Sequence, residues 1–179
     1  MKNIFLECNR VYLRYITQDD FINLKSILQN PEVMYAWEYQ FKDKDVQEWI
    51  DKNQALYRKY NLGYFIIEDK LSHKILGQAA LMPDFIENRL YHEIGYILKK
   101  EYWHNGFATE CAKALTDYAF KKLNLKEVIF EIRPSNNASR NVAERLGAKI
   151  EGEFIKNVRG KDMIHLIYKL PNFNKKSRI

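Results

Sequence analysis

The chain has 179 residues, a length that fits one compact domain with a single hydrophobic core, so we treat residues 1–179 as one domain. Hydrophobic residues make up 46% of the sequence and aromatic residues 14%, which excludes an intrinsically disordered chain. The net charge of +6 suits an anionic partner such as a nucleotide-containing cofactor, a nucleic acid or an anionic membrane, and charge alone does not choose among these.

The basic residues give no sign of a nucleic-acid site. Lysine and arginine are scattered among acidic residues, and the sequence contains neither a recognition helix nor an aromatic RNA-binding motif. We therefore expect no nucleic-acid partner. The basic end of the chain, from about residue 172 to 179, is expected to be a flexible tail.

The two cysteines and the start of the chain bear on location. Cys8 and Cys111 belong neither to a CxxC motif nor to a Cys/His cluster with metal-ligand spacing, so we expect no bound metal and a reducing compartment. Glu7 and Arg10 come too early for the apolar stretch of a signal peptide, and no run approaches the roughly 18 apolar residues of a membrane helix. The sequence predicts a cytoplasmic protein with no membrane partner, as a monomer or a homodimer.

The first half of the chain predicts a strand, two helices and an antiparallel meander. Residues 11–15 alternate with the two-residue period of a half-buried strand, which we expect to be the first strand. Thr17 and Asp20 form a capping-box pattern, and the helical spacing that follows ends at Asn30-Pro31. A longer amphipathic helix is predicted over 43–60. The three strands of the meander are predicted over 63–68, 75–82 and 91–98.

The second half predicts a β-α-β unit followed by a helix and two strands. A helical pattern over 107–123 separates the strand 91–98 from a strand over 127–133, so these two strands should run parallel. A further helix over 139–146 ends at Gly147, a good left-handed cap. The last two strands are predicted over 149–157 and 163–170, on either side of Arg159-Gly160. Together these elements indicate a mixed α/β fold.

The segment from Trp103 to Glu110 leaves a strand, turns through glycine and opens a helix. Free backbone N–H groups in the first turn of a helix, with the positive end of its dipole, bind phosphate. Gly106 and Ala108 are small enough for a pyrophosphate to approach the backbone. The alternative is a hairpin, since Asn105-Gly106 is a common hairpin dipeptide, but the helical spacing after Gly106 favours the phosphate loop.

Five short motifs occur in a characteristic order along the chain. They are Glu93-Ile94-Gly95-Tyr96, Tyr102-Trp103, Gly106-Phe107-Ala108-Thr109-Glu110, Asn136 with Ser139, and Arg145-Leu146-Gly147-Ala148. With these motifs the sequence resembles the GCN5-related N-acetyltransferases, and within them it is most similar to the ribosomal-protein N-terminal acetyltransferases. The resemblance implies a mixed sheet that is splayed open between the fourth and fifth predicted strands, 91–98 and 127–133, and flanked by about four helices. It also implies that acetyl-CoA binds with its pantetheine arm in that gap.

The family's phosphate-loop pattern, Gln/Arg-x-x-Gly-x-Gly/Ala, falls on residues 103–108 of this chain. Trp103 and His104 depart from the residues that are usual there, and backbone binding should survive both changes. The family's strand bulge would place a backbone N–H of Ile97 or Leu98 near the thioester oxygen. Arg140 or Arg145 could reach the adenosine phosphates. The cofactor-binding residues expected from the resemblance are Tyr96, Ile97, Leu98, Trp103, His104, Asn105, Gly106, Phe107, Ala108, Thr109, Asn136 and Arg140.

The resemblance also implies an acetyl transfer to an amine by direct attack in a ternary complex. Glu93 is the expected base, with a structural ion pair as the alternative, and the neighbouring His92 should point to the opposite face of the strand. The tyrosine that often serves as the acid is replaced by Ala143. Ser139 is expected to protonate the thiolate, and Asn136 to hold the pantetheine amides. Helix capping is the alternative interpretation of both.

The acceptor site is expected in the aromatic-rich segment 30–45, with Glu32, Tyr35 and Trp37 as substrate-binding residues. These rings could form a pocket or lid, or could cover one end of the core, and Glu32 and Glu38 could hold a cationic amine. A protein N-terminus, a polyamine, an aminoglycoside or another small amine would each fit. The alternative function is a non-catalytic acyl-CoA-binding sensor.

Overall fold

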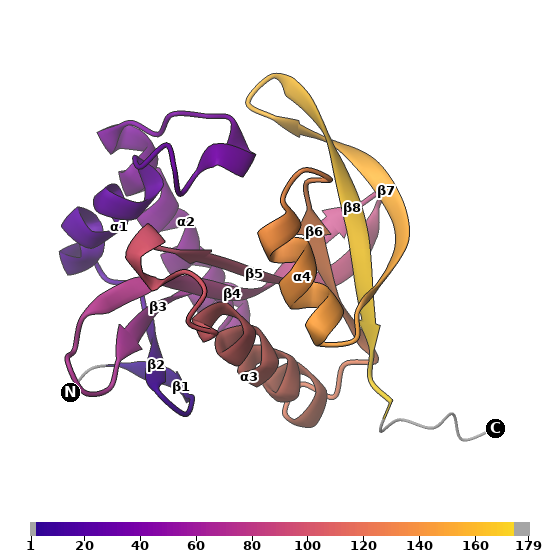
Figure 1. The fold of residues 1–179 in the computed structure, drawn as a ribbon, viewed down its shortest axis with the longest axis horizontal. Coiled ribbons are helices and arrows are strands. Elements are labelled where there is room, and N and C mark those ends of the chain that lie inside the picture. Colours follow the sequence, from indigo (N-terminus) through magenta and orange to yellow (C-terminus); the bar gives the residue numbers. More distant parts are fainter. Residues whose placement is uncertain (1–2, 174–179) are drawn as a thin grey trace.

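The computed structural model describes residues 3–173, which form one eight-stranded sheet flanked by four α-helices (Figure 1). The strand order is β1-β2-β3-β4-β5-β6-β8-β7. The strands are β1 (Ile4–Glu7), β2 (Val11–Tyr15), β3 (Gly63–Asp69), β4 (Ile75–Ile86), β5 (Arg89–Leu98), β6 (Glu127–Ile132), β7 (Lys149–Val158) and β8 (Lys161–Pro171). The helices are α1 (Phe21–Leu28), α2 (Asp43–Tyr60), α3 (Phe107–Lys121) and α4 (Asn137–Arg145), with short 3-10 turns at Gln18–Asp20, Tyr35–Trp37 and Lys100–Tyr102.

Most of the predicted elements are confirmed, with two differences. The strand at 11–15 is the second strand, because β1 precedes it and pairs with it at the sheet edge. The polar link expected between residues 82 and 91 is instead a strand pairing that continues to a two-residue turn, Glu87-Asn88. Both turn residues have positive φ, at 48° and 65°, as a tight hairpin turn requires.

The sheet opens between β5 and β6, as the resemblance implied. β4 and β5 pair continuously from Gly77↔Leu98 to Ile86↔Arg89, whereas β5 and β6 share one parallel pair, Glu93↔Ile129. Beyond this pair the two strands separate toward the carboxyl end of β5. The parallel direction predicted from the crossover helix is confirmed.

The hydrophobic core lies on both faces of the sheet, which explains why β3 is buried along nearly its whole length. Phe65 and Ile67 pack with residues of α3 and α4, and the alternate residues Tyr64 and Ile66 pack with residues of α1 and α2. Two helices therefore cover each face (Figure 1).

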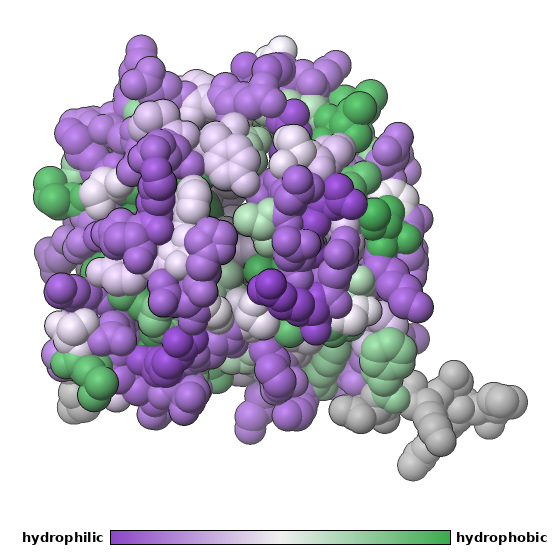
Figure 2. Space-filling view, in the orientation of Figure 1, coloured by the Kyte–Doolittle hydropathy of each residue, from purple (hydrophilic) through white to green (hydrophobic). Residues whose placement is uncertain are grey.

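The ends of the elements and the surface follow ordinary rules. The predicted capping box at Thr17 and Asp20 is confirmed, and α2 spans Asp43–Tyr60 as predicted. Asn172, where the flexible tail was expected to begin, is buried and donates to Leu125 O, while the rest of that tail from residue 174 lies outside the described residues. Figure 2 shows a largely hydrophilic surface with scattered apolar groups. Within residues 3–173, no helix is both long enough and apolar enough to cross a membrane.

Candidate active site

Two cavities meet at the opening between β5 and β6. The larger has a volume of about 540 Å³ and the smaller about 370 Å³. The two cavities adjoin, because six residues line both of them, and we call these six residues the shared wall. The residues that line both are Ala36, Trp37, Tyr96, Ile97, Asn136 and Ser139.

The smaller cavity ends at the start of α3, where the sequence predicted a phosphate loop. Gly106 is the N-cap residue of α3 with φ of 79°, and His104 before it also has a positive φ, 60°. A Cβ on Gly106 would meet only Arg10 Nη2, at 3.6 Å, so the approach to the backbone is open. Gly106, Phe107, Ala108 and Thr109 line the cavity, and this first helical turn has the free N–H groups that can bind an anion.

Arg10, which the sequence did not single out, holds this loop in place. Its Nη1 donates to Asn105 O at 3.0 Å, its Nε donates to Glu110 Oε2 at 2.7 Å, and its guanidinium lies 4.1 Å from the centre of the Phe107 ring. On the other side of the loop, Trp103 Nε1 donates to Leu98 O at 2.9 Å. The loop is therefore tied both to the start of β2 and to the end of β5.

The shared wall is a small hydrogen-bonded group between β5 and α4. Tyr96 Oη donates to Ser139 O at 2.8 Å. Asn136 is the N-cap of α4, where its Oδ1 accepts from Ser139 N at 3.1 Å and also from Tyr35 Oη at 2.8 Å. Asn136 thus caps the helix, as its alternative interpretation predicted, and lines both cavities at once.

Three predicted site residues do not line either cavity. Glu32 pairs with Lys100, and the side chain of Asn105 folds back onto Trp103 O. Arg140 donates to Tyr168 Oη at 2.9 Å and to Pro134 O at 3.2 Å, whereas the other candidate, Arg145, lines the smaller cavity.

The bulge expected near Ile97 or Leu98 is absent from the pairing of β4 with β5, which runs without a register shift. A bulge is not needed to free backbone groups at this place. Because β5 has no partner on its other side beyond the pair at Glu93, the N–H groups that point away from β4 face the gap. Both predicted residues line the smaller cavity.

The aromatic segment 30–45 lies over the gap from the α1–α2 side. Trp37 packs edge to face against Trp49 with ring centres 5.7 Å apart, and it lines both cavities. Glu38 lines neither of these two cavities. It binds Arg133 at 2.9 Å and Lys161, and so joins this segment to β6 and β8. The segment both covers the core and walls the cavities, so the two interpretations left open by the sequence apply together.

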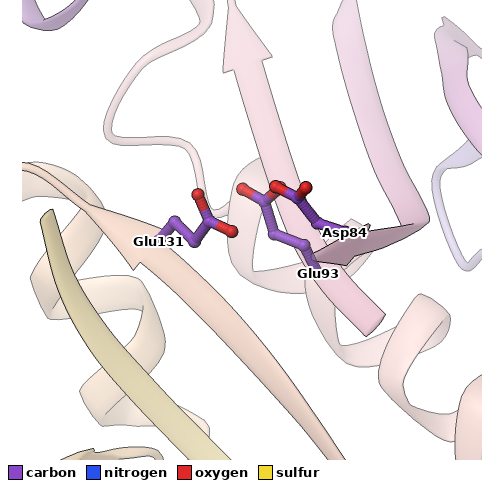
Figure 3. A group of neighbouring side chains, drawn as sticks. All are labelled: Asp84, Glu93 and Glu131. Atoms are coloured by element: carbon purple, nitrogen blue, oxygen red, sulfur yellow. The ribbon is translucent and has the colours of Figure 1, made fainter. Parts of the chain in front are cut away.

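Three carboxyl groups gather in the larger cavity: Asp84 from β4, Glu93 from β5 and Glu131 from β6 (Figure 3). One oxygen of each lies within 4.8 Å of the others, a spacing that a metal ion could use. Lys156 Nζ, however, lies 2.8 Å from Asp84 Oδ2 and 2.5 Å from Glu131 Oε2. Its ammonium group thus takes the place of a cation in the cluster.

Crowding and burial set the charge states of these groups. Burial, followed by the charge of Glu131, raises the pKa of Glu93 well above its ordinary value. Burial also raises the pKa of Glu131 to about 7, although Lys156 opposes the shift. Burial acts in the same direction on Asp84, but its interactions with the neighbouring Glu131 and Lys156 side chains outweigh burial and lower the pKa of Asp84.

Comparisons with known proteins agree with this architecture. The family described as "Acetyltransferase (GNAT) domain" matches residues 10–149. YkkB of Bacillus subtilis (strain 168) is 32% identical over 170 residues, which cover 94% of this chain and 96% of YkkB. A Bacillus licheniformis protein named as the uncharacterized N-acetyltransferase p20 is 38% identical over 155 residues, 85% of each chain.

Solved structures share the fold at lower identity. The ribosomal-protein-S5-alanine acetyltransferase of Vibrio fischeri superposes with a TM-score of 0.75 and 24% identity, covering 96% of this chain and 98% of its own. Spermidine N-acetyltransferase of Vibrio cholerae, in complex with CoA and spermine, superposes with a TM-score of 0.71 and 19% identity. The match covers 90% of this chain and 95% of the Vibrio cholerae chain. The open mixed sheet is thus the GNAT fold. The chain belongs to the GNAT family of acetyltransferases, enzymes that use acetyl-CoA to acetylate amines.

Proposed function

We propose that this protein binds acetyl-CoA in the smaller cavity and transfers its acetyl group to a primary amine bound in the larger one. The observation that carries the proposal is the shared wall at the gap between β5 and β6, with a helix N-terminus on one side and ionisable carboxyl groups on the other. Two reactants that are bound side by side in these adjoining cavities can react directly, in a ternary complex.

The residues of the smaller cavity fit the cofactor. The open approach to Gly106 and the start of α3 would hold the pyrophosphate. The exposed edge of β5 beyond Glu93 offers backbone donors and acceptors to the pantetheine amides, and Asn136 faces the same space. When bound, acetyl-CoA supplies the acetyl group as an activated thioester. Backbone N–H groups near Ile97 and Leu98 would then stabilise the developing oxyanion.

Side chains near the shared wall would complete the site. Ser139 lines both cavities, and its hydroxyl group would give a proton to the departing thiolate. Glu93 on β5 would contact the acceptor's amino group. Tyr35 and Trp37 would line the route by which that amino group reaches the thioester. These roles follow from position and from the chemistry that amide formation requires.

The acceptor class is a primary amine, and its finer identity is part of the proposal. Structural neighbours named for acetylation of a ribosomal protein and of spermidine support a protein N-terminus or a polyamine. We favour the branch that contains the ribosomal-protein acetyltransferases (RimJ/RimL-like), because the motifs of this chain are most similar to it. Cys8 and Cys111 are both free thiols, which fits the predicted cytoplasmic location.

The test combines binding with turnover. Calorimetric titration of the full chain with acetyl-CoA should show micromolar binding, and CoA release should be detected with at least one amine from a panel of spermine, an alanyl peptide and an aminoglycoside. Absence of binding at millimolar acetyl-CoA would refute the proposal. Binding without transfer to any amine would instead favour the acyl-CoA sensor.

A further inference from the structure

The larger cavity contains a carboxyl group that the proposed function leaves without a role. Glu131 extends from β6 toward Glu93 on β5, across the place where the two strands separate (Figure 3). Its side chain is only 2% exposed. One oxygen, Oε2, accepts from Lys156, and the other, Oε1, is buried without a hydrogen-bond partner among the described residues. Such a group is costly to bury unless something else uses it.

Glu93 is in a similar position. Only 8% of its surface is exposed, and its Oε2 also has no hydrogen-bond partner within residues 3–173. Asp84, by contrast, accepts from Lys156 and from the backbone N–H of Phe85. The cluster therefore has three carboxyl groups, one ammonium group and two unused carboxyl oxygens beside a cavity.

The two arginines that line the larger cavity are paired with other carboxyl groups. Arg133 pairs with Glu38, and Arg159 pairs with Asp45, both outside the cluster. His165 Nδ1 donates to Met163 O at 3.0 Å, and burial lowers the pKa of His165, so it adds no positive charge at neutral pH. The titratable and charged groups that line the larger cavity besides the cluster are Lys52 on α2, Tyr64 on β3, Tyr96 on β5, Arg133 just after β6, Arg159 in the turn after β7 and His165 on β8.

The two glutamates differ in their neighbours, and this difference assigns their protons. Lys156 forms an ion pair with Glu131 and with Asp84, but none is found with Glu93 within residues 3–173. Burial, followed by the charge of Glu131, raises the pKa of Glu93 well above its ordinary value, while burial raises that of Glu131 to about 7. We therefore assign the carboxylate that accepts a proton to Glu131, which Lys156 contacts, and the proton that the pair holds to Glu93, which has no ion pair within residues 3–173.

We propose that Glu131 is a second catalytic residue, which takes the proton of the acceptor's ammonium group, while Lys156 and Asp84 position its carboxylate in the cavity. The proposal rests on the proposed function, because it concerns the same acceptor site. Glu93 then acts mainly as a hydrogen-bonding group for the amine, which narrows the role that the sequence gave it.

The proton balance is simple. The ammonium group loses one proton to Glu131, and the neutral amine attacks the thioester carbon. As the C–N bond forms and the C–S bond breaks, the nitrogen loses a second proton and the thiolate gains one. Glu131 then releases its proton to solvent, so each turnover yields an amide, CoA and one proton.

The experiment compares acceptors that differ in their need for a base. Spermine and an alanyl peptide are protonated at neutral pH, whereas hydroxylamine is already a neutral nucleophile. Glu131→Gln should slow CoA release with the protonated amines by about 100-fold and with hydroxylamine by no more than about threefold. Glu127→Gln, on the same strand but ion-paired at the surface with Arg89, is the matched control and should leave both rates unchanged.

The pH profile adds a readout that a structural role would not move. The acidic limb of kcat/KM with the protonated amines should lie near pH 7 in the unmodified protein and disappear in Glu131→Gln. Lys156→Met should move this limb to higher pH, because it removes the positive charge that favours the carboxylate. An equal rate loss with all acceptors, or an acidic limb that survives in Glu131→Gln, would overturn the assignment.

A second measurement does not depend on turnover. Carbon-13 NMR of glutamate carboxyl groups in the full chain should show one resonance, missing from Glu131→Gln, that titrates near neutral pH. A second resonance, missing from Glu93→Gln, should titrate at higher pH. The reverse order would overturn the inference even if acetyl transfer is confirmed. Failure to bind acetyl-CoA would refute the proposed function while this titration still reports on the pair.

Discussion

The two cavities are built in different ways, although they share a wall. The smaller one depends on backbone groups of one short segment, 104–109, at the start of α3. The larger one depends on side chains that come from β4, β5, β6 and β7 and meet only in the folded sheet. Backbone recognition is local and tolerant of side-chain changes, whereas a carboxyl cluster changes its chemistry with each member.

This contrast teaches where the specificity of the protein should reside. A backbone anion site serves any molecule with the same phosphate groups, so the smaller cavity suits a common cofactor. The larger cavity can be retuned by single substitutions on separate strands. We therefore expect substitutions in the loop to affect cofactor binding alone, and substitutions in the cluster to affect catalysis and pH dependence.

Gly106→Trp should weaken acetyl-CoA binding by more than about 100-fold, equivalent to about 3 kcal/mol, because the indole would block the approach to the backbone. Calorimetric titration measures the loss. The matched control is Gly160→Trp, since Gly160 has a similar φ of 84° and open space around it but lies in the β7–β8 turn. If both variants lose binding equally, strain at a positive φ rather than blockage explains the effect.

Ser139→Ala should lower kcat by about 100-fold and leave acetyl-CoA affinity unchanged, because it removes the proposed proton donor but keeps the backbone N–H that Asn136 caps. Steady-state kinetics of CoA release, beside a binding titration, separates the two quantities. Ser135→Ala, in the exposed turn before α4, is the control. A loss of affinity with unchanged kcat would place Ser139 in cofactor binding instead.

Glu131 should make stability depend on pH. Its pKa rises from 4.5 in the unfolded chain to about 7 in the folded protein, so between these values the folded state binds more protons and its stability falls as pH rises. A pKa shift converts to free energy at about 1.4 kcal/mol per pKa unit. Because Lys156 lies nearby, we expect the free energy of unfolding to fall by about 2 kcal/mol across this pH range. Urea unfolding of the unmodified protein and of Glu131→Gln, below and above this window, should show that difference. A constant gap between the two proteins would refute it.

Arg145→Ala should weaken acetyl-CoA binding by about fivefold, because an exposed arginine on the cavity wall contributes about 1 kcal/mol to a phosphate contact. Arg140→Ala should leave affinity within about twofold, since its guanidinium is engaged with Tyr168 and Pro134. Titrations of the two variants decide between them. A larger effect at Arg140 would mean that its side chain turns toward the cofactor.

Local patterns in the sequence predicted most of the fold. The amphipathic spacing of α2 and the capping box before α1 depend on neighbours a few residues away, and both were found where expected. β1 was missed because four residues at a sheet edge, only partly buried, show no clear alternation. The β4–β5 hairpin was predicted too short because Glu87-Asn88 is not one of the common glycine-containing turns.

The candidate site shows the same difference between residues that local patterns predict and residues that only the folded sheet brings together. The phosphate loop could be predicted because glycine, a turn and a helix start are adjacent in sequence. Glu131 was missed because it stands between Phe130 and Ile132 on a strand, a pattern that indicates a solvent-facing side chain, and Lys156 was missed because β7 alternates polar and apolar residues in the same way. Both side chains face the larger cavity because strands that are far apart in the sequence surround one gap. Arg10 was missed for a similar reason, since its partner Glu110 is 100 residues away.

The order in which strands join the sheet divides folding into two regions. From β1 to β5 each strand pairs with the next one along the chain, and β7 and β8 form a hairpin to which β6 adds. Among residues 3–173 a single backbone pair joins these regions, so we expect hydrogen exchange to report two units that open separately. A ligand that spans the gap would couple them into one cooperative unit. Its concentration would then govern the cooperativity of unfolding as well as the rate of any reaction.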